Sequence, residues 1–222
     1  MIPYCMCYSA RSSFATFLIG FIFSVVLIQF GNPAYTRENT TFGVFFVFIS
    51  LIQLMDFGFW MDLRNSLGIN RLLTIIGPIL NAGQPIILYL VKLAVVRPTT
   101  YNLPVLAMNL AYGIYLSYAY IKFLTEEKTL ITTTKHGHLE WRWLDYVYPA
   151  FYLIPFAVNA FYLTDFSYSL FVFLITSLFM VWSVRYFPYR IGEMWCFFGA
   201  FIPGLVFLFQ TRLRLSPLLG VA

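Results

Sequence analysis

The chain has 222 residues, of which 60% are hydrophobic, 21% are aromatic and only 10% are charged. Soluble domains usually carry about 25% charged residues, so this composition argues against an ordinary water-soluble fold and predicts an integral membrane protein whose partner is the lipid bilayer. The formal net charge is +5, but the basic residues stand singly between apolar runs and form no basic patch, which argues against a nucleic-acid partner.

Seven apolar stretches are long enough to cross a bilayer, because a spanning helix needs about 20 mainly apolar residues. In chain order, we predict spans at residues 12–30, 41–61, 70–93, 101–123, 145–163, 166–185 and 191–210. The first run is longer than the apolar part of a signal peptide, so we interpret it as a span. The only long connection is the polar loop 125–144. The sequence therefore predicts one all-α domain, a polytopic transmembrane helical bundle covering residues 1–222.

Orientation follows from the basic residues in the loops. With seven spans, nine of the 14 lysines and arginines fall on the side of the N-terminus, which predicts a cytoplasmic N-terminus, a cytoplasmic 125–144 loop and an outside C-terminus. The tryptophans fall near that same side, where we expect them at the headgroup boundary: Trp60, Trp141, Trp143, Trp182 and Trp195. The sequon Asn39-Thr40-Thr41 falls outside, so Asn39 is a candidate glycosylation acceptor, although it lies close to the second span.

A weak internal repeat relates the two ends of the chain. A shift of about 125 residues superposes residues 46–48 on residues 171–173, both Phe-Val-Phe, and Pro78 on Pro203. Spans one to three and five to seven would then be parallel triple-helix units joined by span four, a 3+1+3 arrangement that occurs in small seven-span sugar carriers. Chance matches are easy in a chain with 25 phenylalanines, so the repeat is a hypothesis.

Helix-breaking residues crowd the middle of the third predicted span, and one more lies within the seventh: Gly77, Pro78, Gly83, Pro85 and Pro203. Each proline removes a helical hydrogen bond, so backbone carbonyl groups are freed at membrane depth and need partners. Broken helices of this kind surround solutes in transporters. The alternative is a kinked helix whose Asn81 and Gln84 hydrogen-bond to neighbouring helices.

An acidic residue, Asp56, lies inside the second predicted span and shares a helix face with Gln53, three residues earlier. A carboxylate within the membrane is costly, which makes it a candidate functional group. We consider two roles for Asp56, a cation or proton site and a structural partner for Arg185 or Arg190.

These features combine into one candidate binding site between the second, third and seventh spans: Gln53, Asp56, Asn81, Gln84 and Glu193. The site favours a carrier or channel-like protein for a small solute or a cation. The alternative is a non-transporting membrane scaffold or sensor that acts through the 125–144 loop.

Enzymatic activity is not predicted, because no nucleophile can be paired with a base and no nucleotide or metalloprotease motif occurs. No cofactor is implied. The residues most able to hold a metal are two short pairs on the cytoplasmic side, Cys5 with Cys7 and His136 with His138, whose spacing is unlike that of a zinc finger. Lipidation of Cys5 and Cys7 is an alternative use of the thiols.

Several segments of the first hundred residues resemble a family of small polytopic membrane proteins encoded by large DNA viruses. They are Cys-Tyr-Ser-Ala-Arg-Ser-Ser-Phe at 7–14, the run 31–39 that begins Gly-Asn-Pro, Ile-Gln-Leu-Met-Asp-Phe at 52–57 and Gly-Pro-Ile-Leu-Asn at 77–81. The resemblance implies a membrane protein from a viral or microbial source. It implies no activity and assigns no site residue.

Overall fold

A computed structural model describes residues 9–100, 102–135, 138–186 and 191–215, without the side chains of residues 135, 191–193 and 212–215. This part of the chain is almost entirely helical, which confirms the predicted all-α class. Its helices are α1 (Ala10–Phe30), α2 (Thr36–Met61), α3 (Ile69–Ala82), α4 (Gln84–Val96), α5 (Leu103–Glu126), α6 (Pro149–Phe161), α7 (Phe166–Tyr186), α8 (Ile191–Gly199) and α9 (Ile202–Leu215). Short elements are the 3-10 turns η1 (Pro33–Tyr35) and η2 (Arg142–Tyr146) and the antiparallel hairpin of β1 (Thr133–Lys135) and β2 (His138–Glu140).

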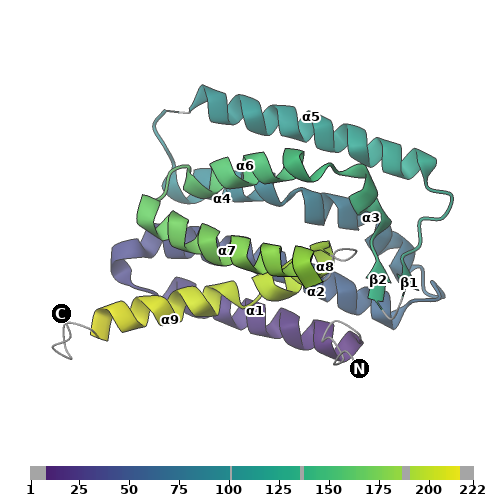
Figure 1. Cartoon of the computed structure of the whole chain (residues 1–222), viewed down its shortest axis with the longest axis horizontal. Coiled ribbons are helices and arrows are strands. Elements are labelled where there is room, and N and C mark those ends of the chain that lie inside the picture. Colours follow the sequence, from purple (N-terminus) through teal and green to yellow (C-terminus); the bar gives the residue numbers. More distant parts are fainter. Residues whose placement is uncertain (1–8, 101, 136–137, 187–190, 216–222) are drawn as a thin grey trace.

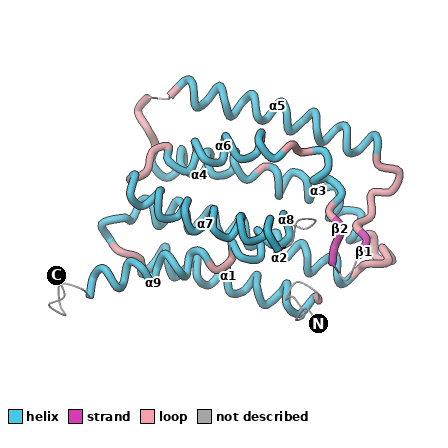
Figure 2. Tube along the Cα trace, viewed as in Figure 1, coloured by secondary structure: helices cyan, strands magenta, loops and turns pink. Residues whose placement is uncertain are grey.

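The helices run to and fro between two ends of the bundle (Figure 1). The start of α1 and the β-hairpin lie at one end, here called the hairpin end, and the far end of α9 lies at the other, here called the opposite end. The connecting loops gather at these two ends (Figure 2). The predicted alternation of spans requires the same arrangement, with the N-terminus and the 125–144 loop on one side.

Within the described residues, four segments are long and apolar enough to cross a membrane, namely Ala10–Phe30, Pro33–Met61, Phe166–Tyr186 and Met194–Thr211. The pair α3 and α4 becomes a fifth if it counts as one span, although its two helices are bent by 62° at Gly83. The predicted fourth span, α5, has 24 residues, but its tyrosines and Asn109 make it less apolar. The predicted fifth span is the 13-residue α6, which rises only about 20 Å against a hydrocarbon core of about 30 Å.

The outer helices turn small and polar side chains inward and large apolar ones outward. In α1 the buried residues are Ser13, Thr16, Gly20, Ser24 and Leu27, whereas Phe14, Leu18, Phe21, Ile22 and Phe23 are exposed. Helix α7 repeats the pattern, with buried Ser169 and Thr176 and exposed Leu174 and Leu178. Water would drive the opposite arrangement, but lipid allows small residues to bring helices close together. The pattern therefore suits an apolar surrounding.

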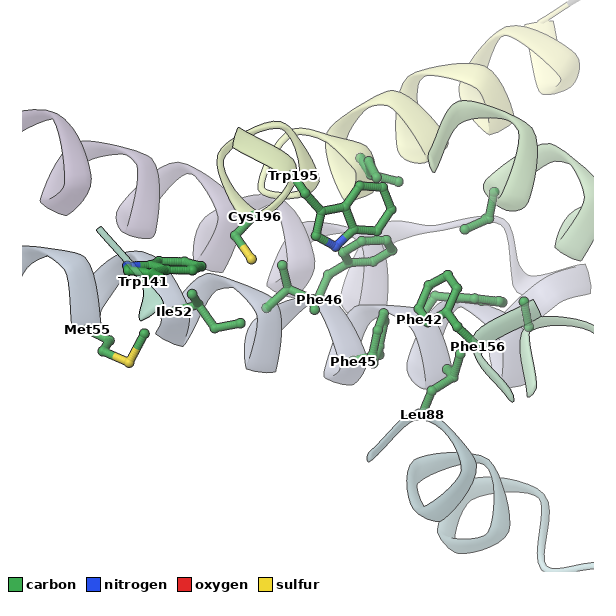
Figure 3. Packing of buried hydrophobic residues seen from close by; sticks show 14 of the residues in the cluster. Phe42, Phe45, Phe46, Ile52, Met55, Leu88, Trp141, Phe156, Trp195 and Cys196 are labelled. Carbon is green, nitrogen blue, oxygen red and sulfur yellow. The ribbon is translucent and has the colours of Figure 1, made fainter. Parts of the chain in front are cut away.

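Helix α2 occupies the centre of the bundle and packs against α1, α3, α4, α8 and α9. Its phenylalanines Phe42, Phe45 and Phe46 lie in the largest apolar cluster, which Figure 3 shows together with Phe156 and Trp195. The rings of Phe45 and Phe156 are 6.0 Å apart, and those of Phe156 and Trp195 meet edge to face at 6.2 Å. These rings join α2, α6 and α8.

The 125–144 loop is folded against the bundle. The backbone N–H of Thr132 donates to Asn70 Oδ1 at 2.8 Å, and the Thr132 carbonyl accepts from Asn70 Nδ2 at 2.8 Å. The hydroxyls of Thr132 and Thr74 are 2.9 Å apart. Charged residues of the loop stay at the surface, where Arg142 pairs with Glu127 at 3.2 Å. The loop thus closes the hairpin end over α3.

The interpretation of the tryptophans as a headgroup belt needs correction. Trp141, Trp143 and Trp195 are buried, at 6%, 1% and 8% exposure, whereas Trp182 is 51% exposed. Trp141 and Trp143 stack on each other at 5.3 Å between ring centroids. In the sequence, Trp141 and Trp143 lie near the ends of predicted spans, which favours the headgroup boundary. The folded loop instead carries both rings into the bundle, where they bury more apolar area.

A buried carboxylate, Asp62, organises the turn between α2 and α3. Asp62, buried in this turn, accepts hydrogen bonds from the N–H groups of Leu67, Ile69 and Asn70 and from the Ser66 hydroxyl, at 2.9–3.3 Å. Burial raises the pKa of the Asp62 carboxyl, but these hydrogen bonds outweigh it and hold the pKa below its ordinary value. The ionised carboxylate satisfies the first N–H groups of α3.

Candidate functional site

Two helix breaks lie side by side in the middle of the bundle. One is at Gly83, between α3 and α4, and the other follows Gly199, between α8 and α9. The amide nitrogens of Asn81 and Gln84 lie 3.6 Å and 3.8 Å from the sulfur of Cys196, which is fully buried. Figure 3 shows Cys196 beside the α2 side chains. The predicted site residues Asn81 and Gln84 are therefore brought together through α8.

The side chain of Gln84 joins three helices. It is fully buried, and its Oε1 accepts a hydrogen bond from the Tyr152 hydroxyl of α6 at 2.5 Å and a longer one from Trp195 Nε1 of α8 at 3.4 Å. Its Nε2 faces the Cys196 sulfur. All of the hydrogen-bonding atoms of Gln84 are thus engaged at mid-depth.

Two backbone carbonyls beside the bend accept hydrogen bonds from neighbouring helices. The Tyr112 hydroxyl of α5 donates to the Ala82 carbonyl at 2.6 Å, and Asn159 Nδ2 of α6 donates to the Pro85 carbonyl at 2.9 Å. Asn159 and Asn109 also bond to each other at 2.8 Å and 3.0 Å. These bonds are what the interpretation of a kinked, hydrogen-bonded helix requires.

The five predicted break residues differ in their structural roles. Helix α3 continues through Gly77 and Pro78 and ends at Ala82, and the bend is at Gly83. A Cβ at Gly83 would collide with the Ile79 carbonyl oxygen, so the bend requires glycine here. Pro85 and Pro203 lie in the first turns of α4 and α9, where a proline costs no hydrogen bond.

The predicted pair on α2 lies deep in the protein. Gln53 is 0% exposed and Asp56 is 1% exposed, on the helix that packs against α3, α4 and α8. Both amide atoms of Gln53 are buried and have no hydrogen-bond partner among the described residues. A buried amide without partners is costly, so the described packing gives no structural reason for a glutamine at position 53.

Other predicted residues are placed as follows. Glu193 belongs to α8, but its side chain lies outside the described part, as do Cys5, Cys7, His136 and Arg190. His138 is buried in β2. Within the described ranges, no group of three or more His, Cys, Asp or Glu residues is placed to hold a metal ion.

The candidate glycosylation acceptor is not accessible in the folded chain. Asn39 is 2% exposed, and its Nδ2, the atom that would carry a glycan, donates to the Asn32 carbonyl at 3.0 Å. Its Oδ1 accepts from the Tyr168 hydroxyl at 3.0 Å and from Gln210 Nε2 at 2.9 Å. Asn39 instead joins α2, α7 and α9 at the opposite end.

Sequence reasoning missed the polar residues on the partner helices, namely Lys92, Asn109, Tyr112, Tyr152 and Asn159. The orientation argument treats Lys92 as a loop charge, but it is fully buried and donates to the carbonyls of Ala160 and Tyr162 at 2.8 Å and 2.7 Å. Its position inside an apolar run, like that of Asn109 and Asn159, was the available signal, because buried polar groups in such runs need partners.

No protein-family model, curated protein or solved structure matches this chain. The resemblance of the first hundred residues to viral membrane proteins therefore stays a prediction.

Close packing at mid-depth yields a testable difference between two glycines. A Cβ at Gly20 of α1 would collide with the Ser50 hydroxyl and lie 2.9 Å from the Ala200 Cβ, whereas a Cβ at Gly113 of α5 would meet only Ile86, at 3.7 Å. We expect Gly20→Ala to lower the free energy of unfolding by about 1–3 kcal/mol. We expect Gly113→Ala to be neutral or to stabilise by up to about 1 kcal/mol.

Unfolding in detergent, followed by circular dichroism, compares the two variants. If Gly20→Ala unfolds like Gly113→Ala, helix α1 does not pack tightly against the break after α8.

Proposed function

We propose that this protein is a multi-pass integral membrane protein that carries or conducts a small solute or cation through a polar site at the two helix breaks. Several features support placement in the bilayer with about seven crossings. They are the four long apolar segments, the outward-facing apolar side chains and the alternation between the two ends (Figure 1). The cytoplasmic N-terminus and the 3+1+3 repeat belong to the same proposal and rest on the sequence alone.

One observation carries the proposed site: the wholly buried amide of Gln53, without a hydrogen-bond partner among the described residues, on the helix that packs against both broken segments. A buried polar side chain that has no partner in the described part of the fold is available to a passing solute. Asn81, Gln84, Asp56 and Glu193 complete the proposed site. The breaks themselves resemble in kind the discontinuous helices that surround solutes in carriers.

The folded 125–144 loop fits this proposal as a closure of the cytoplasmic end. Its contacts with Asn70 and Thr74 hold it over α3, the first half of the bent span. Thr132, Trp141 and Trp143 of the loop are buried, whereas charged residues such as Glu126 and Lys128 are exposed.

Replacing Gln53 by leucine tests the site. Leucine removes the Gln53 amide without removing a hydrogen bond within the described part of the chain, so we expect the stability to stay the same or to rise by about 1–3 kcal/mol. We expect flux to fall at least about tenfold, a loss of roughly 1.4 kcal/mol or more in the transport step, because the solute loses its polar contact. The measurement is flux into reconstituted vesicles across a panel of protons, alkali cations and neutral sugars.

Gln29→Leu is the matched control, because Gln29 is an exposed glutamine near the end of α1 and its loss should leave flux unchanged. Asp56→Asn tests whether flux also depends on the carboxylate of Asp56, the other residue of the proposed site on α2. Wild-type vesicles that pass no member of the panel, or a Gln53→Leu variant with full flux, would refute the proposal.

A further inference from the structure

An apolar cleft of about 380 Å³ opens on the side of the bundle between α6 and α7, with Trp195 of α8 in its wall. Its size falls within the range of about 300–1,000 Å³ that is usual for pockets that hold small molecules. The residues that line it include Tyr152, Phe156, Ala157, Phe173, Met180 and Trp195.

The cleft exists because α6 is short and meets α7 closely at one end. Beside the turn that joins the two helices, Phe161 lies 5.6 Å from Phe166 and 5.4 Å from Phe173 between ring centroids. Further along, the aromatic wall is built by α6 and α8, where Tyr152 stacks on Phe156 at 5.9 Å. No helix of the described part of the chain fills the space between this wall and the middle of α7, and this space is the cleft.

The lining offers little to a polar ligand. The surface of the cleft is almost wholly apolar, and two of its hydroxyls are already used. The Tyr152 hydroxyl donates to Gln84, and the Thr176 hydroxyl donates to the Val172 carbonyl at 2.5 Å. The occupant must therefore be hydrocarbon along most of its length.

The mouth of the cleft faces the surface that carries the exposed apolar side chains. Ile154 and Val181 line it and are 58% and 65% exposed, and Leu178 beside them is 67% exposed. Arg185 lies four residues after Val181, hence on the same face of α7, in the last turn of the helix at the hairpin end. A cation thus lies at the end of α7, about one helical turn beyond the apolar cleft.

We propose that this cleft binds one acyl chain of a membrane phospholipid whose phosphate group pairs with Arg185. The chain packs against the Phe156 and Trp195 rings, and the attraction comes from close contact, because bilayer hydrocarbon is itself apolar and supplies no hydrophobic drive. The inference rests on placement in a membrane and is independent of transport, so a failed flux assay leaves it intact.

Photocrosslinking tests the proposal on the full chain in phosphatidylcholine vesicles that contain a phosphatidylcholine with a diazirine in one acyl chain. The crosslinked peptides are mapped by mass spectrometry, and labelling of α6 and α7 is divided by labelling of the exposed Phe21 to Phe23 surface of α1. The α1 surface represents ordinary contact with lipid. We expect α6 and α7 to be labelled several-fold more than this surface. Ala157→Phe, which fills the cleft, should lower the ratio to the value of ordinary lipid contact, and Arg185→Gln should lower it part of the way.

Val158→Phe is the matched control, because Val158 is the next residue, is 39% exposed and is not part of the lining. Ser177→Phe fills the cleft from α7 and keeps the test decisive if Ala157→Phe does not fold. Equal labelling of the cleft and of the α1 surface, or labelling that neither filled variant reduces, would overturn the proposal. Loss of labelling in the filled variants together with full labelling in Arg185→Gln would overturn the assignment of the phosphate group.

Discussion

Replacing Lys92 by methionine is expected to lower the free energy of unfolding by about 2–4 kcal/mol, because an unsatisfied buried acceptor costs about 1–3 kcal/mol and two carbonyls are affected. Lys92 Nζ donates to the carbonyls of Ala160 and Tyr162 and to the Thr164 hydroxyl at 3.0 Å. Thr164 also donates to the Ala160 carbonyl, which limits the loss at that position. Nζ further lies 5.2 Å from the centre of the Phe42 ring, a favourable contact for a cation.

The lysine acts on the most strained part of the chain near α6. The connection to α7 contains Leu163 at a φ of 58°, a left-handed conformation that a leucine adopts only when its surroundings enforce it. Lys92 binds the carbonyls of Ala160, in the last turn of α6, and of Tyr162, the residue that caps this helix, and so supports the reversal of the chain.

Unfolding of Lys92→Met in detergent, followed by circular dichroism, provides the measurement. Lys122→Met is the control, because the Lys122 side chain is 46% exposed and its ion pair with Glu126 should contribute no more than about 0.5 kcal/mol. A Lys92→Met variant as stable as the control would show that the end of α6 does not depend on this contact.

Replacing Trp143 by alanine is expected to cost about 3–5 kcal/mol, the range for large aromatic residues removed from a packed core. Trp143 is 1% exposed and contacts rings from three parts of the chain. It stacks on Phe59 at 6.2 Å, stacks on Trp141 at 5.3 Å and meets Phe123 edge to face at 6.5 Å. It also covers Gly77, where an added Cβ would lie 2.8 Å from the indole.

The same substitution should release the 125–144 loop from the bundle. Trypsin is then expected to cleave at the exposed Lys128 faster than in the parent protein, at a temperature where the remaining bundle stays folded. Trp182→Ala is the control, because Trp182 is 51% exposed and lies outside the cluster. Unchanged proteolysis together with a loss of stability below about 1 kcal/mol would contradict the described packing.

The helical class and most helix positions were predictable because long apolar segments can be recognised from their amino-acid composition. Residues 12–30, 41–61 and 166–185 fall inside α1, α2 and α7, since long apolar stretches must form helices wherever water is absent. The place of the bend was less predictable. Two prolines pointed to a wide region, but whether a proline kinks a helix or is accommodated depends on neighbours, and Pro78 is accommodated.

The details of the candidate site depended on contacts between residues far apart in the chain. The partners of Gln84 come from residues 152 and 195, and no local pattern specifies such pairings. The 125–144 loop was read as polar because of its charges, but alternate positions such as Trp141 and Trp143 bury their rings while Arg142 stays outside. The sequence therefore predicted which groups needed partners better than it predicted the partners.

The paired helix breaks have an electrostatic consequence. Every helix carries a partial negative charge at its carboxyl end and a partial positive charge at its amino end. Because α3 ends and α4 begins at Gly83, and α8 ends close to the start of α9, four helix termini meet in the interior instead of at the two faces of the bundle. The middle of this protein thus has a built-in field that needs no formal charge, and it would act on any ion brought to that depth.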